Sequence, residues 1–211
     1  YTAANDGTLK RLLYTGLNNR VLQNVRWLEG DRFLAAYFGA VGEPVLWFTA
    51  DAEARPISPA PSRNRPSTIM PGASPDGRRV VIGGTFDTAA GAGVTGYYLN
   101  VVNNNFFELL FEVSLPGNNS PPPVPVIDAA RDLVSRVYVV RPVEDRPMLQ
   151  CFNRDEGVLH DLAELPPVFS ESARGGLWLS PDGTTLALTA TGTAGGLWLI
   201  DLAALPACQG E

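Results

Sequence analysis

Apolar residues occur along this chain in short runs that are separated by polar residues, glycine and proline. The runs alternate with polar positions or form short blocks, and 18 prolines and 21 glycines punctuate them. Such a pattern predicts β-strands joined by turns and loops. The helical segments that we expect are single turns, near residues 129–133 and 202–205. The chain is therefore predicted to be all-β.

One tetrapeptide divides the chain into repeating units. Ser-Pro-Asp-Gly occurs at 74–77 and again at 180–183, and each copy precedes an apolar run. Proline presets φ, aspartate bonds the backbone two residues on and glycine accepts a positive φ, so both copies are predicted to be tight turns. Weaker copies lie near residues 30 and 131. The resulting spacings of about 47, 54 and 51 residues are close to the ~40–50 residues of a four-stranded β-propeller blade.

A full unit contains four predicted strands, which we call a to d, with the tight turn between a and b. The predicted units span residues 24–58, 68–113, 122–163 and 174–205. The last unit ends after its c strand, and the run at 8–14 is predicted to supply the missing d strand. Closing the ring in this way would remove exposed sheet edges. We expect one domain, residues 1–211, which is either a complete four-bladed propeller or a fragment of a larger one.

These features resemble a known family. Ser-Pro-Asp-Gly, an apolar strand and a further apolar strand that ends in aspartate resemble the WD40-like repeat of TolB and related bacterial β-propellers. Residues 180–201 match best, with the run Leu197-Trp198-Leu199-Ile200-Asp201 as the c strand. The resemblance implies the propeller fold and a tendency to bind partners. It does not imply one activity. We separately expect a periplasmic or extracellular location.

Propeller connectivity sorts the loops onto two faces. The a–b and c–d turns share one face, and the longer b–c and d–a loops share the other. The longer loops are predicted at 58–67, 85–94, 116–123, 141–146 and 163–174. Long loops on a rigid scaffold often bind partners, so we expect a partner-binding site on this face. Its candidate residues are Arg63, Arg65, Glu144, Asp145, Arg146, Glu171 and Arg174.

The four tryptophans recur at matching positions of the units. Trp27 and Trp178 fall on a strands, and Trp47 and Trp198 fall on c strands. Recurrence at the same position of a blade indicates packing between blades rather than a ligand cage.

Composition narrows the class of protein. The formal net charge of −6 argues against a nucleic-acid binder, which would need clustered basic residues. Lys10 is the sole lysine, and this arginine bias suggests a bacterial genome. No run approaches the ~18 apolar residues of a membrane span, so we expect membrane contact only through a partner or a missing anchor. Cys151 and Cys208 either form one disulfide in an exported protein or remain a buried and a free thiol.

Catalytic and cofactor motifs receive little support. His160 is the sole histidine, which excludes a multi-histidine metal site, and no Gly-x-Ser-x-Gly motif accompanies it. The glycines at 91–96 fit a dinucleotide-binding spacing, but a strand follows them where that motif needs a helix. The polar cluster at 153–156 is interpreted as a hairpin turn rather than a calcium site. We expect no cofactor and no metal.

Two hypotheses about function follow. The sequence favours a non-catalytic propeller that acts as a scaffold or interaction module and docks a protein partner. The alternative is the propeller portion of a hydrolase, such as a serine peptidase, a lactonase or a glycan-acting enzyme.

Overall fold

The computed structural model describes part of the 211-residue chain. The described residues are 22–27, 33–37, 46–48, 54–56, 70–74, 79–85, 95–101, 107–113, 126–128, 136–171, 176–190 and 195–209. The predicted closing strand at 8–14 lies outside them.

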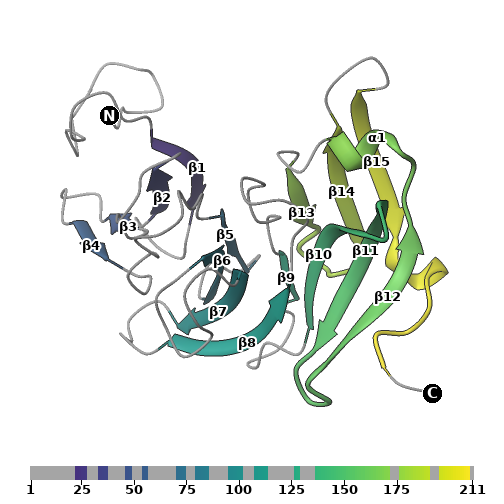
Figure 1. The fold of residues 1–211 in the computed structure, drawn as a ribbon. Coiled ribbons are helices and arrows are strands. Elements are labelled where there is room, and N and C mark those ends of the chain that lie inside the picture. The colour runs from purple at the N-terminus through teal and green to yellow at the C-terminus, as the bar shows by residue number, and fades with distance from the viewer. Residues whose placement is uncertain are drawn as a thin grey trace.

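The strands form four antiparallel sheets, each built from consecutive strands (Figure 1). The first sheet contains β1 (Leu22–Trp27), β2 (Phe33–Tyr37), β3 (Leu46–Phe48) and β4 (Ala54–Pro56). The second contains β5 (Met70–Ala73), β6 (Arg79–Thr85), β7 (Thr95–Val101) and β8 (Phe107–Val113). The third contains β9 (Val126–Asp128), β10 (Arg136–Val143), β11 (Arg146–Asn153) and β12 (Val158–Glu164). The fourth contains β13 (Leu177–Leu179), β14 (Thr185–Ala190) and β15 (Gly196–Asp201).

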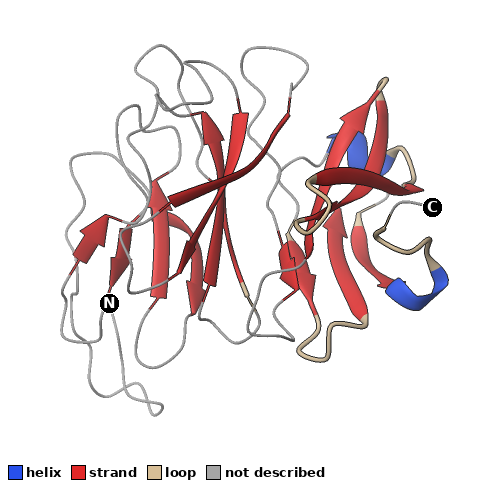
Figure 2. Cartoon of the chain, turned by 90° about the horizontal axis from the view of Figure 1, so that it is seen from below, coloured by secondary structure: helices blue, strands red, loops and turns tan. Residues whose placement is uncertain are grey.

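The first strands of successive sheets lie side by side. β1 contacts β5, β5 contacts β9, and β9 contacts β13. The sheets therefore follow one another in chain order around a common centre, with later strands farther out, as Figures 1 and 2 show. This arrangement is that of a β-propeller and confirms the predicted all-β fold class. The number of blades in the full ring stays a prediction.

The repeated turn signature has a structural cause. Ser74 and Ser180 make the same contacts with the residue five positions further along the chain. The Ser74 backbone N–H donates to the Arg79 carbonyl, and the Ser180 backbone N–H donates to the Thr185 carbonyl, both at 2.9 Å. Each hydroxyl oxygen also accepts a backbone N–H, from Arg79 at 3.0 Å and from Thr185 at 2.9 Å. The serine therefore closes the a–b turn with its side chain as well as its backbone.

Asp182 completes the second copy of this turn. Its carboxylate accepts hydrogen bonds from the Ser180 hydroxyl at 2.5 Å and from the Thr184 backbone at 3.1 Å. These bonds lower the pKa of the Asp182 carboxyl. Gly183 has a φ of 73°, which glycine adopts without the strain that other residues incur there. The structural interpretation of the motif is supported at this copy.

Apolar side chains fill the space between neighbouring sheets. Between the third and fourth sheets, Tyr138 and Leu149 share a buried cluster with Leu177, Leu186 and Leu188. The buried positions of β14 alternate with half-buried ones, so one face of the fourth sheet supplies this cluster.

A second buried cluster lies between the second and third sheets. Tyr97 of β7 stacks on Phe111, and Phe111 contacts Phe152 of β11, with ring centroids 4.6 and 4.7 Å apart. Burial raises the pKa of the Tyr97 hydroxyl well above its ordinary value. Gly83 makes room for this ring, since a Cβ there would lie 2.6 Å from Tyr97 Cε1. The third sheet is thus packed on both faces.

Three local predictions change. The predicted long loop at 141–146 is wrong, because β10 continues to Val143 and β11 begins at Arg146, which leaves a two-residue turn. The d–a loop at 163–174 contains a short helix, α1 (Val168–Glu171), that was not predicted, whereas the 3₁₀ turn η1 (Leu202–Ala204) confirms the one expected near 202–205. Cys151 and Cys208 form a disulfide, so the free-thiol alternative is wrong.

Candidate functional site

The predicted charged face is only partly described. Glu144 and Asp145 form the tight turn between β10 and β11, and Arg146 is the first residue of β11. Glu171 ends α1. Arg63, Arg65 and Arg174 lie outside the described residues.

Within that face, the Arg146 guanidinium is shared by carboxylates of its own sheet. It lies 3.5 Å from Glu144 and 3.1 Å from Glu164. All three side chains are exposed, and exposed ion pairs of this kind contribute about 0–1 kcal/mol. With the exposed Asp145 beside them, this part of the face presents three acidic groups and one basic group.

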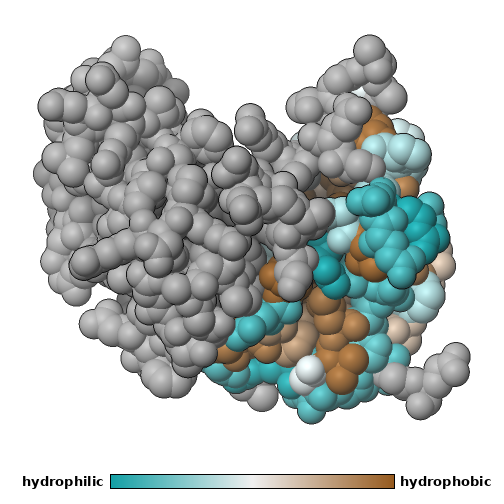
Figure 3. All heavy atoms as spheres, in the orientation of Figure 1, coloured by the Kyte–Doolittle hydropathy of each residue, from teal (hydrophilic) through white to brown (hydrophobic). Residues whose placement is uncertain are grey.

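A different surface stands out on the fourth sheet, on the side turned away from the third sheet. We call it the distal face and define it by Trp178, Ala187, Leu197 and Leu199. Trp178 lies opposite Ala187 in the β13–β14 pair, and Ala187 lies opposite Leu199 in the β14–β15 pair, so their side chains share one face. Trp178 is 41% exposed, Leu197 66% and Leu199 69%. On the visible face of the molecule, Figure 3 shows hydrophobic residues gathered in patches among hydrophilic ones.

The tryptophans of the fourth sheet partly follow the expectation of packing between blades. Trp198 faces the third sheet and meets Phe169 of α1 edge to face, with ring centroids 5.6 Å apart. Trp178 lies over Gly176, where a Cβ would be 1.6 Å from its ring, and it is 41% exposed. The side chains of Trp27 and Trp47 lie outside the described residues.

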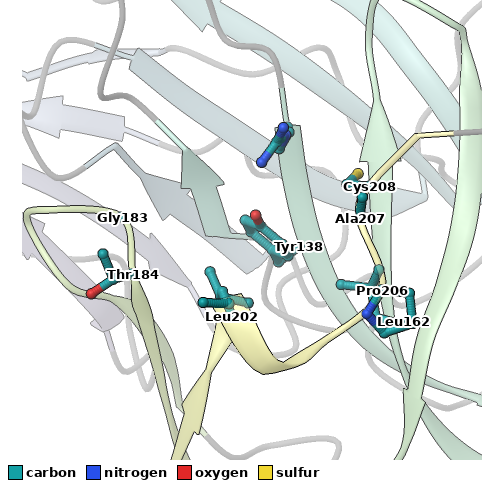
Figure 4. Close-up of a pocket in the computed structure, with 10 residues that line it drawn as sticks. Tyr138, Leu162, Gly183, Thr184, Leu202, Pro206, Ala207 and Cys208 are labelled. Atoms are coloured by element: carbon teal, nitrogen blue, oxygen red, sulfur yellow. The ribbon is translucent and has the colours of Figure 1, made fainter.

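A pocket opens between the third and fourth sheets, on the face of the a–b turns (Figure 4). Its volume is about 240 Å³. Tyr138 forms its floor, Thr184 and Leu202 lie on one side, and Leu162 and Pro206 lie on the other. This is the face opposite the one that sequence analysis favoured.

The C-terminal segment forms one wall of this pocket and is held by the disulfide. Cys208 bonds to Cys151 of β11 with a Cα–Cα distance of 5.9 Å, and both residues are buried. The Asn153 amide donates to the Cys208 carbonyl at 2.8 Å. The repeat pattern does not reveal the pocket, because one wall comes from a segment outside the repeat.

Polar side chains between the second and third sheets are paired. Arg141 donates to the buried Gln150, and Gln150 donates to Asp161, so a hydrogen-bonded row crosses β10, β11 and β12. At the end of the hairpin, Arg154 of the third sheet makes a two-pronged ion pair with Glu108 of the second, at 3.1 and 2.6 Å. These groups join sheets rather than line a reactive site.

His160 and the polar turn at 153–156 also have local partners. The His160 ring lies 2.8 Å from the Glu156 carboxylate. The Asn153 side chain accepts backbone N–H groups of Asp155 and Glu156, as a capped hairpin turn requires. No cluster of three or more potential metal ligands occurs among the described residues. In the same part of the chain, no helix has the length and apolar character needed to cross a membrane.

Comparison with solved structures identifies the fold. The chain is similar to TolB from Acinetobacter baumannii, at 12% identity and a TM-score of 0.54, over 84% of this chain and 41% of that one. It is similar to a chain of a nidogen/laminin complex, at 16% identity and a TM-score of 0.56, over 87% and 62%. It is also similar to an oligogalacturonate lyase from Vibrio parahaemolyticus, at 12% identity and a TM-score of 0.55, over 82% and 46%.

The similarity is one of fold alone. Neither a protein-family model nor a curated protein matches the sequence. The chain spans about two to three fifths of the length of the solved chains described above. The solved structures include a protein from a complex and an enzyme, so they do not select one activity. The chain has the fold of a TolB-like β-propeller.

Proposed function

We propose that the protein is a non-catalytic interaction module that docks a protein partner on the distal face. The observation that supports this proposal is the exposure of a tryptophan on β13 and two leucines on β15, on the same face of one sheet with Ala187 of β14 between them. Contiguous apolar patches on a protein surface commonly mark interaction sites.

The sequence of β15 supports a covered distal face. Residues 197–200 are apolar without alternation, a pattern typical of strands that are buried on both faces. One face of the fourth sheet packs on the third sheet, and Ile200 lies in that interface. The other face would be covered by the partner. Because the sheets of this protein pack face to face, the partner that fits best presents an apolar β-sheet surface of its own.

The apolar patch is too small to form a stable interface by itself. Two leucines and one tryptophan at these exposures offer roughly 300 Å², below the ~800 Å² per partner of a typical stable interface. The partner would therefore also contact neighbouring elements, with the distal face as the apolar centre. Burying the two leucines would contribute about 1–2 kcal/mol each.

To test this proposal, the protein is purified from its source cells and the intact mass of the native assembly is measured. The proteins bound to it are identified in the same measurement. The variant Leu197→Thr/Leu199→Thr removes the apolar centre and keeps strand-forming residues. Val158→Thr is the matched control, because Val158 is an apolar strand residue that is 46% exposed on the third sheet. We expect a stoichiometric partner that the wild type and the control retain and whose affinity the double variant lowers roughly ten- to a hundredfold.

Two failures would be distinguishable. Catalytic turnover by the purified chain with no partner bound would refute the interaction function. A partner retained equally by the double variant would refute the distal face and leave the function standing. In that case the combined alanine replacement of Arg63, Arg65, Arg146 and Arg174 tests the face that sequence analysis favoured.

An extracytoplasmic location in a bacterium is part of the same proposal. The Cys151–Cys208 disulfide supports it, because disulfides persist mainly in oxidising compartments. Contact with a membrane would then run through the partner or an anchor. Fractionation of the source cells, with the redox state of the two cysteines measured by thiol labelling, tests the location.

The second candidate is the propeller portion of a hydrolase. It is supported by the observation that the chain spans less than half the length of two of its structural neighbours. A catalytic domain encoded in the same gene, with hydrolysis of a peptide, lactone or glycan by the full product, would establish this candidate.

A further inference from the structure

We infer that the pocket between the third and fourth sheets binds a small carboxylate that carries a short aliphatic group. The pocket lies apart from the distal face, on the other side of the fourth sheet, so this inference does not depend on the proposed docking surface.

The charge of the pocket selects for an anion. Arg136 is its sole charged lining residue, at the first position of β10. Arg136 is half-buried, and no described side chain forms a hydrogen bond or an ion pair with it. A guanidinium in this setting binds a carboxylate with two parallel hydrogen bonds, which are about twice as strong as neutral ones.

The remaining lining selects for a small apolar group. Leu162, Leu202, Pro206 and Ala207 surround the floor made by the Tyr138 ring, as Figure 4 shows. The volume of about 240 Å³ is below the ~300–1,000 Å³ of most ligand pockets, so the ligand is no larger than one amino-acid residue.

The walls are fixed before any ligand arrives. The disulfide and the Asn153 amide hold the segment that contains Pro206 and Ala207. On the other side, the Leu202 backbone N–H donates to the Thr184 carbonyl at 2.9 Å, which joins η1 to the a–b turn. A preformed pocket binds with less loss of conformational entropy than a flexible one.

One neighbouring residue supplies a sharp test. Asp128 lies directly opposite Arg136 in the β9–β10 pair. Residues at directly opposite positions of an antiparallel pair influence each other, so a negative charge at this position is expected to lower the affinity of the arginine for an anion. The Asp128→Asn variant is therefore expected to strengthen binding of the ligand.

The experiment measures binding of isovalerate to the full chain by titration calorimetry and ligand-observed NMR. Isovaleramide, which has the same shape without the charge, is the matched control ligand. We expect isovalerate to bind and isovaleramide to bind at least tenfold more weakly. The Arg136→Gln variant is expected to weaken isovalerate binding about ten- to a hundredfold, whereas Asp128→Asn strengthens it several-fold.

Further probes distinguish the two sources of such a carboxylate. A tetrapeptide with a C-terminal leucine carboxylate represents a protein C-terminus, and its amidated form is the control. Tighter binding of the free-acid peptide than of isovalerate identifies a chain terminus as the ligand, and the reverse order identifies a free short-chain acid.

The variants also separate ligand loss from unfolding. Arg146→Gln changes an exposed arginine at the opposite end of the same hairpin and is expected to leave binding unchanged. The inference is overturned if isovalerate and isovaleramide bind equally, or if Arg136→Gln and Arg146→Gln bind isovalerate alike while both variants keep the wild-type circular dichroism. It is also overturned if none of the acids binds to the wild type.

Discussion

The disulfide gives the strongest quantitative prediction for stability. Cys151 and Cys208 are separated by 57 residues, and both are buried. In the loop-entropy account, a cross-link that closes a loop of this length removes about 4 kcal/mol of conformational entropy from the unfolded chain. We therefore expect Cys151→Ala/Cys208→Ala to lower the free energy of unfolding by about 4 kcal/mol.

This loss is large beside the ~5–15 kcal/mol total stability of a typical domain. With a urea dependence of ~2 kcal/mol per molar, the unfolding midpoint is expected to fall by about 2 M. Tryptophan fluorescence reports the transition, because Trp178 and Trp198 both lie on the fourth sheet beside the cross-linked segment. The urea dependence itself is expected to rise, because the unfolded chain without the bond exposes more surface.

Single variants sharpen the test. Because either substitution breaks the same bond, Cys151→Ala and Cys208→Ala are each expected to cost nearly as much as the double variant, so their effects do not add. The intact mass of the oxidised wild type should be lower than that of the reduced protein by two hydrogen atoms. A loss below about 1 kcal/mol in the double variant, or additive single effects, would refute the reasoning from loop closure.

Three further substitutions test local features. Glu144 and Asp145 have φ values of 48° and 63°, so Glu144→Asn/Asp145→Gly is expected to raise stability by about 0.5–1 kcal/mol, measured by thermal unfolding, and no gain would contradict the strain. Gly83→Ala places a Cβ against the buried Tyr97 ring and is expected to lower the free energy of unfolding by about 1–3 kcal/mol, measured by urea unfolding. Gly157→Ala is the comparison, because its Cβ meets no neighbour and the substitution adds backbone strain without a clash. The lowered pKa of Asp182 means that its ionised form stabilises the fold above the ordinary aspartate range, and this contribution is lost as the pH falls through the folded pKa. The stability difference between wild type and Asp182→Ala is therefore expected at pH 7 and should shrink in acid; a difference independent of pH would contradict it.

The repeat made most of the described architecture predictable. The spacing of the Ser-Pro-Asp-Gly copies located the a–b turns, and Ser180 and Asp182 make the turn contacts that their side chains favour. Strand ends also followed the pattern closely, since β7 (Thr95–Val101) and β15 (Gly196–Asp201) lie within a residue of the c strands that the sequence predicts at 96–102 and 196–202. Local turn chemistry and alternation are encoded within a few residues, so a single sequence carries them.

Features that depend on distant or atypical residues were not predictable. The turn at 144–145 has positive φ values without the Asn-Gly residues that signal such a turn, so the hairpin was mistaken for a long loop. The disulfide joins strands to a segment beyond the last repeat, and only their three-dimensional arrangement brings the two cysteines together. The pocket depends on the same segment, so it was missed for the same reason.

The third and fourth sheets provide an internal comparison for the distal face. The third sheet is apolar on both faces, with Val137 and Val139 directed toward the second sheet and Tyr138 and Leu149 toward the fourth, and both faces are buried. In the fourth sheet, β13 and β15 carry apolar residues on both faces, whereas Thr185 and Thr189 of β14 lie on the distal face, and only one face of the sheet meets another sheet among the described residues. Alternation of apolar and polar residues is typical of a strand with one face in water, and β15 does not alternate. Because the third sheet is buried on both faces, this comparison supports the proposal that a partner covers the distal face.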